Sequence, residues 1–172
     1  MSTSPHAPGS ALQPHQRFRL LRRTPDRAQL LVDGKATGLA LDGLDLQAAY
    51  AWQGLHLLLV HTGNHFEDAL YCYLLSASLE VLDQAAIGGF YSTGELGALR
   101  VIGPDAIAFT FPSSAQAWHL RLLPRPSWRL PFVCGQFGVW GRRAFRRHFV
   151  LRRCAQLPPL RGDGTREGAG DV

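Results

Sequence analysis

Short stretches in which apolar and polar residues alternate, each closed by a turn signal, recur along most of this chain. The clearest is AIAFTF at 106–111, which follows the turn signal Gly103-Pro104-Asp105 and precedes a second such stretch, WHLRL at 118–122. A period of two places successive side chains on opposite faces of a strand, and Gly, Pro and Asp favour the turns between strands. The pattern therefore predicts a mainly β, antiparallel protein.

The number and spacing of these stretches set the expected architecture. About eight to ten short strands over about 140 residues suit a single antiparallel meander domain, barrel-like or made of two sheets, across 17–160. Short hairpin turns dominate, which favours the closed or nearly closed barrel. The segment GRRAFRRHFVLRRC at 141–154 has two interpretations. Its Phe spacing slightly favours a short C-terminal helix, whereas the alternation within 148–152 favours a final strand.

The two ends of the chain differ from its centre in composition. Residues 1–16 and 161–172 are rich in Gly, Pro, Ser or charge and poor in large apolar side chains, so we expect flexible tails. The first segment lacks the pattern of a secretory signal, and no apolar stretch approaches the roughly 18 residues of a membrane helix. Three widely spaced Cys favour reduced thiols over disulfides or a zinc site. We therefore expect a cytoplasmic protein without a membrane span, metal or cofactor.

Charge is unevenly distributed along the sequence. Residues 31–120 hold nine acids against Lys35 and Arg100, whereas 121–172 hold eleven Arg against three acids. All basic residues except Lys35 are Arg, whose planar fork suits carboxylates and phosphates. Two interpretations stay open at this point: the basic and acidic parts pair within the fold, or one of them faces an oppositely charged partner.

Two binding surfaces follow from the second interpretation. Acidic residues at expected turns predict a rim that a basic cleft on a partner protein would bind, formed by Asp42, Asp45, Glu67 and Asp68. The C-terminal segment, in which Arg is interleaved with Trp and Phe, suits single-stranded nucleic acid or an acidic protein surface, because Arg contacts phosphates and carboxylates and aromatic rings stack on bases. Its predicted binding residues are Arg142, Arg143, Arg146 and Arg147.

Catalytic and metal chemistry have little support in the residue pattern. A possible ligand set clusters around one expected hairpin loop and comprises His56, His61, His65, Glu67 and Asp68. Five positions separate the first two histidines, so a regular strand would turn them to opposite faces, and no metal site is predicted. Nucleophile-elbow, phosphate-loop and dinucleotide motifs are absent from the sequence. A Cys134–His119 pair is conceivable, but nothing in the spacing supports it.

These observations favour a non-catalytic protein-binding module, and its most specific form is an immunity-type inhibitor of a cytoplasm-acting bacterial toxin. A nucleic-acid-binding protein is the first alternative. The second is a β-barrel that holds a small ligand or acts on it, for which the pocket would be lined by Trp52, Tyr71, Phe109 and Trp118. The oligomeric state is left open.

Overall fold

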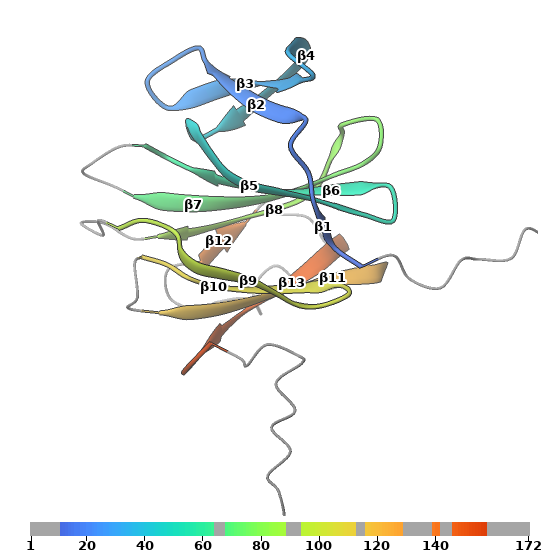
Figure 1. The fold of residues 1–172 in the computed structure, drawn as a ribbon, viewed down its shortest axis with the longest axis vertical. Coiled ribbons are helices and arrows are strands. Elements are labelled where there is room, and N and C mark those ends of the chain that lie inside the picture. The colour runs from blue at the N-terminus through green and yellow to red at the C-terminus, as the bar shows by residue number, and fades with distance from the viewer. Residues whose placement is uncertain are drawn as a thin grey trace, which may run out of the picture.

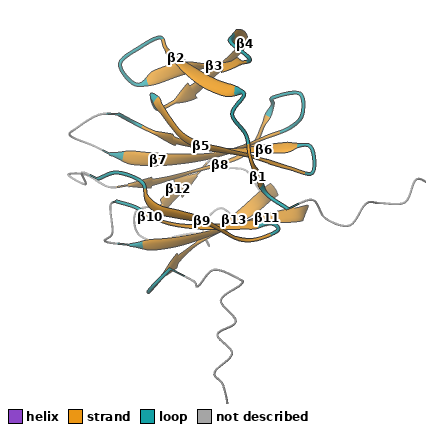
Figure 2. Ribbon diagram, in the orientation of Figure 1, coloured by secondary structure: helices purple, strands orange, loops and turns teal. Residues whose placement is uncertain are grey.

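The computed structural model describes residues 11–63, 68–88, 94–112, 116–128, 139–141 and 146–157. These residues form thirteen strands and no helix, as Figure 2 shows. The strands make three antiparallel sheets, which confirms the predicted fold class. In the described part of the chain, no helix has the length and apolar character needed to cross a membrane.

The three sheets are stacked, with the largest in the middle (Figure 1). The middle sheet has the strand order β1 (Gln13–Pro14), β5 (Asp45–Trp52), β6 (Leu55–His61), β7 (Ala69–Leu75), β8 (Val81–Gly88) and β12 (Val139–Gly141). One outer sheet has the order β13 (Arg146–Cys154), β11 (Ala117–Trp128), β10 (Ala106–Thr110) and β9 (Gly97–Gly103). The other consists of β2 (Phe18–Arg22), β3 (Arg27–Val32) and β4 (Lys35–Asp42).

The middle sheet is buried on both faces, which explains the run of apolar residues in β6. Leu57 and Leu59 pack into the core shared with the four-stranded sheet, which we call the first core. Leu58 and Val60 pack into the core shared with the three-stranded sheet, which we call the second core. All four side chains are fully buried. A strand covered on one side alternates in polarity, but a strand covered on both sides has no wet face and needs apolar residues throughout.

The four-stranded sheet keeps the alternation that the sequence predicted. Ile107, Phe109, Trp118 and Leu120 point into the first core, and Phe149 joins them from β13. The indole N–H of Trp118 donates to the carbonyl oxygen of Phe111 at 2.8 Å, so its one polar atom is satisfied inside the core. The opposite face of this sheet carries the polar residues.

Two tight hairpins set the register of neighbouring strands. Asp33 and Gly34 join β3 to β4 with φ of 50° and 78°, and Gln53 and Gly54 join β5 to β6 with φ of 50° and 78°. Two consecutive residues with positive φ make the turn whose twist matches that of the strands, and glycine adopts this conformation without steric cost. The glycine in each pair is the sequence signal for these turns.

Several expectations about the architecture are wrong. The sheets do not close into a barrel, because a middle sheet with two apolar faces needs a separate layer on each side. The expected strand count is too low, since it omits the short strands β1 and β12 and also β4, whose alternation is interrupted at Gly38, with φ of 80°. The proposed helix at 141–154 is also wrong over 146–154, which form β13, and residues 142–145 lie outside the described residues.

The boundary of the expected N-terminal tail is also placed too late. β1 pairs with β5, and Leu12, only 4% exposed, is part of the first core. Residues 11–16 therefore belong to the fold. Residues 1–10 and the expected C-terminal tail, 161–172, lie outside the described residues.

The pocket expected inside a barrel does not form from the four aromatic residues predicted to line it. Trp52, Phe109 and Trp118 are packed among the other side chains of the first core. Tyr71 lies on the opposite face of the middle sheet, against the second core. Successive residues of a strand point to opposite faces, and on β7 it is Cys72 that points into the first core. Its neighbour Tyr71 therefore points away from the other three aromatic residues.

Candidate anion-binding face

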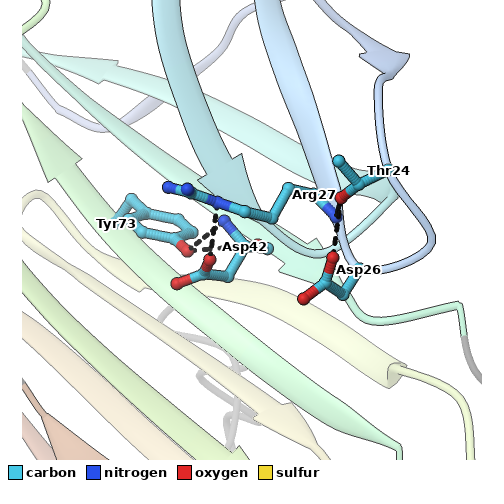
Figure 3. Close-up of polar contacts among 5 residues, drawn as sticks. All are labelled: Thr24, Asp26, Arg27, Asp42 and Tyr73. Atoms are coloured by element: carbon cyan, nitrogen blue, oxygen red, sulfur yellow. Dashed lines mark hydrogen bonds and ion pairs between the residues drawn. The ribbon is translucent and has the colours of Figure 1, made fainter.

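The described members of the predicted acidic rim differ in burial and in their contacts. Asp42, at the end of β4, is engaged within the fold (Figure 3): its Oδ1 is 3.1 Å from Nε of Arg27, and both groups are about half exposed. The Tyr73 hydroxyl accepts from the Asp42 backbone N–H at 3.0 Å and donates to its carbonyl oxygen at 3.1 Å. Burial raises the pKa of Tyr73, so its hydroxyl keeps the proton that this bond needs. Asp45 is exposed at the start of β5.

Asp68 is buried rather than displayed, and Glu67 lies outside the described residues. One carboxylate oxygen of Asp68 lies 3.3 Å from Nε2 of His61, and the other accepts from the Gly94 backbone N–H at 2.8 Å. The Gly63 N–H donates to His61 Nδ1, which leaves Nε2 as the protonated nitrogen facing the carboxylate. The contact is electrostatic and is not aligned as a hydrogen bond. Asp68 therefore holds two loop segments together.

The histidines of the expected ligand set do not meet. His61 stacks edge-on against Phe111 of the first core, whereas His56 contacts His15 and Phe18 on the other side of the middle sheet. This confirms the prediction that His56 and His61 face opposite ways. His65, like Glu67, lies outside the described residues. Within the described ranges, no group of three or more His, Cys, Asp or Glu is placed to hold a metal ion.

The predicted basic residues of the C-terminal segment have structural contacts where they are described. Arg146 is exposed and lies over the ring of Trp128, its guanidinium carbon 5.8 Å from the ring centroid. Arg147 is 14% exposed, and its Nε bonds to the Asp83 carboxylate at 3.1 Å. Arg142 and Arg143 lie outside the described residues, as does Cys134.

Asp83 lies inside β8 and is fully buried. Besides Arg147, its Oδ2 accepts from the backbone N–H groups of His148 at 2.7 Å and Phe149 at 3.3 Å. Its Oδ1 accepts from the N–H of Gln84 at 2.8 Å. The carboxylate thus joins the middle sheet to the four-stranded sheet, and Arg147 is part of this internal pair rather than a free binding residue.

Basic side chains do gather on the outer face of the four-stranded sheet. Strand register aligns one residue from each strand in a single row: Arg100 of β9, Ala108 of β10, His119 of β11 and Arg152 of β13. Arg100 and Arg152 are exposed, and neither has an acidic partner among the described residues. We call this surface the basic face and define it by Arg100, His119, Arg121 and Arg152.

Arg121 occupies the next row of the basic face, and its charge is partly compensated. Its Nε bonds to Asp105 Oδ2 at 2.9 Å, while the guanidinium stays 62% exposed. Between the rows is a pocket of about 270 Å³, lined by His119, Arg121, Leu123, Val150 and Arg152. The basic face therefore combines three guanidinium groups with a single carboxylate.

His119 is the titratable residue of this pocket. Burial, followed by the charges of Arg121 and Arg152, lowers its pKa, and Asp105 opposes the shift. The imidazole is therefore neutral at pH 7. Its Nε2 is buried and has no hydrogen-bond partner in the part of the chain that the structure describes.

The molecule is therefore an antiparallel β protein of three stacked sheets, and the basic face is its candidate anion-binding surface. No protein-family model, curated protein or solved structure matches the chain. Sequence reasoning placed His119 and Arg121 on a wet strand face but did not combine them with Arg100, which is about 20 positions away. The sequence shows that these two residues alternate with buried ones. It does not show the strand register that aligns them with residues of β9 and β13.

Proposed function

We propose that this protein is a non-catalytic binding module that captures an acidic surface of a partner protein through the basic face. The observation that supports this is the alignment of Arg100 and Arg152 across the sheet with no acidic neighbour among the described residues. Uncompensated guanidinium groups on a rigid sheet steer an acidic partner and fix its orientation. We prefer this surface to the acidic rim, because Asp42 and Asp68 are engaged by Arg27 and His61 within the fold.

The placement of aromatic residues favours a protein partner over single-stranded nucleic acid. Nucleic-acid surfaces of that kind combine positive charge with exposed rings on which bases stack. In the four-stranded sheet, Phe109, Trp118 and Phe149 point into the core, on the side opposite the basic face. Trp128 is exposed, but Arg146 lies against its ring. Among the described residues, the rings of this sheet therefore point into the core or are covered by an arginine, rather than lining the basic face.

An immunity-type toxin inhibitor is the specific form of this proposal. Such an inhibitor would seal an acidic cleft in a cytoplasm-acting toxin, with the guanidinium groups opposite the carboxylates of the cleft. Complementary charge also accelerates association, which an inhibitor needs in order to capture a toxin before it acts.

The test is capture of the partner by the tagged protein and by two charge-matched variants. The first is Arg100→Ala/Arg152→Ala, and the control is Arg19→Ala/Arg22→Ala, which removes two exposed arginines from the three-stranded sheet. Lysate is treated with nuclease and loaded at low salt, and the bound proteins are identified by mass spectrometry. We expect a stoichiometric partner that high salt releases, that the control retains and that the first variant loses.

Three results would contradict the proposal. The first variant retains the same partner, only nucleic acid is recovered before nuclease treatment, or no macromolecule is recovered at all. A partner that passes the test should then bind in purified form with an association rate that falls steeply as ionic strength rises.

A further inference from the structure

We propose that the pocket among His119, Arg121 and Arg152 is a carboxylate site, which takes a carboxyl group carried on a short aliphatic chain. The inference rests on the proposed function for the source of that group, an acidic side chain or the C-terminus of the partner. The pocket chemistry itself is testable without the partner, with small carboxylates as probes.

The charges around the pocket favour the binding of an anion. Arg152 contributes a guanidinium with no acidic partner among the described residues, and Arg121 contributes a second whose Nε alone is engaged, by Asp105. Each guanidinium offers planar, parallel N–H donors that match the two oxygens of a carboxylate. One carboxylate beside two guanidinium groups leaves a local excess of positive charge that a bound anion would neutralise.

The remaining walls select the kind of anion. Leu123 and Val150 line the same pocket, so part of its surface is apolar. A phosphate would present oxygen to these walls on every side, whereas a carboxylate on a methylene chain places its oxygens toward the guanidinium groups and its CH₂ groups against Leu123 and Val150. At about 270 Å³ the pocket lies below the roughly 300–1,000 Å³ of typical small-molecule sites. It suits the end of a side chain or a very small molecule.

His119 couples this site to protons. The charged groups around it are Arg121 of β11, Arg152 of β13 and Asp105 between β9 and β10, with Arg100 of β9 further along the same row. Seating a negative charge here offsets the repulsion from the guanidinium groups and favours imidazolium. Binding therefore takes up a proton, and affinity increases as the pH falls from about 7 to about 5, where a carboxylate is still ionised.

The experiment is a titration of the 172-residue chain with butyrate as the probe, followed by NMR of its histidine ring protons and, for the variant that lacks His119, by calorimetry. Butyramide has the same shape without charge, and inorganic phosphate represents the other class of oxyanion. We expect saturable shifts of the His119 signals with butyrate only. Arg152→Ala should weaken binding about tenfold, because it removes charged hydrogen bonds, and Arg19→Ala should not change it. His119→Gln keeps a donor and should bind with no pH dependence.

Each other outcome overturns the site. Equal binding of butyramide would remove the role of charge, and tighter binding of phosphate than butyrate would assign another anion class. No saturable shift with any probe at about 100 mM would show that the pocket is not an anion site, because that concentration corresponds to only about 1.4 kcal/mol of binding free energy. The two proposals fail separately. Loss of butyrate binding with partner capture intact would remove the site, and intact butyrate binding without a partner would leave a carboxylate pocket whose ligand is a free small molecule.

Discussion

Removing the Asp83 carboxylate should weaken the contact between the middle sheet and the four-stranded sheet and so lower the unfolding free energy. Asp83→Ala takes away the acceptor for Arg147 and for the backbone N–H groups of His148 and Phe149, at a position with no solvent exposure. The Arg147 side chain, only 14% exposed, then keeps its charge without the carboxylate that balances it. Breaking a buried ion pair in this way costs about 3–5 kcal/mol of unfolding free energy. For a chain of this length, the melting temperature should fall by roughly 6–20 °C.

A surface pair of the same chemistry provides the control. Asp105 and Arg121 also meet through Oδ2 and Nε, at 2.9 Å compared with 3.1 Å for the buried pair, but the guanidinium is 62% exposed. Asp105→Ala should therefore cost less than about 1 kcal/mol.

Urea unfolding at pH 7 measures both losses, and Asp83→Asn, which keeps the shape and one acceptor, covers the case in which the alanine variant does not fold. If Asp83→Ala and Asp105→Ala destabilise the protein equally, burial does not set the strength of this contact and the reasoning fails.

Three further predictions concern other buried groups. Tyr73→Phe leaves the N–H and carbonyl of Asp42 without their partner and should lower the unfolding free energy by about 1–2 kcal/mol, against no change for an exposed substitution such as Leu21→Ala. Burial raises the pKa of the Cys72 thiol to about 12, so iodoacetamide at about pH 8 should label Cys154 and spare Cys72 until urea is added; labelling of both in the native protein would contradict the buried position. Burial lowers the pKa of His56, His119 and His148, so the unfolded chain binds more protons below about pH 6.5, and the unfolding free energy should fall between about pH 7 and pH 5. Replacing the three with Gln should flatten that slope, and an unchanged slope would assign the pH dependence to other groups.

The sequence by itself determined the local structure of this protein. Alternation over 106–111 and 118–122 defined strands with one apolar face, and the Asp33-Gly34 turn was readable because its backbone angles favour these residues. It also separated His56 from His61, since both follow from the period of a single strand. Each of these features depends on residues a few positions apart, within reach of one pattern.

Only the tertiary structure decided how the strands assemble and which charges remain free. The apolar run in β6 is compatible with a barrel wall or with a sheet covered on both sides, and the presence of a third sheet settles which. Arg147 and Arg152 are both arginines of one strand, yet one is held by a buried carboxylate 64 positions away and the other faces outward beside His119. Pairing between distant residues depends on strand register and layer order, which are set by packing over the whole chain and leave no local signal.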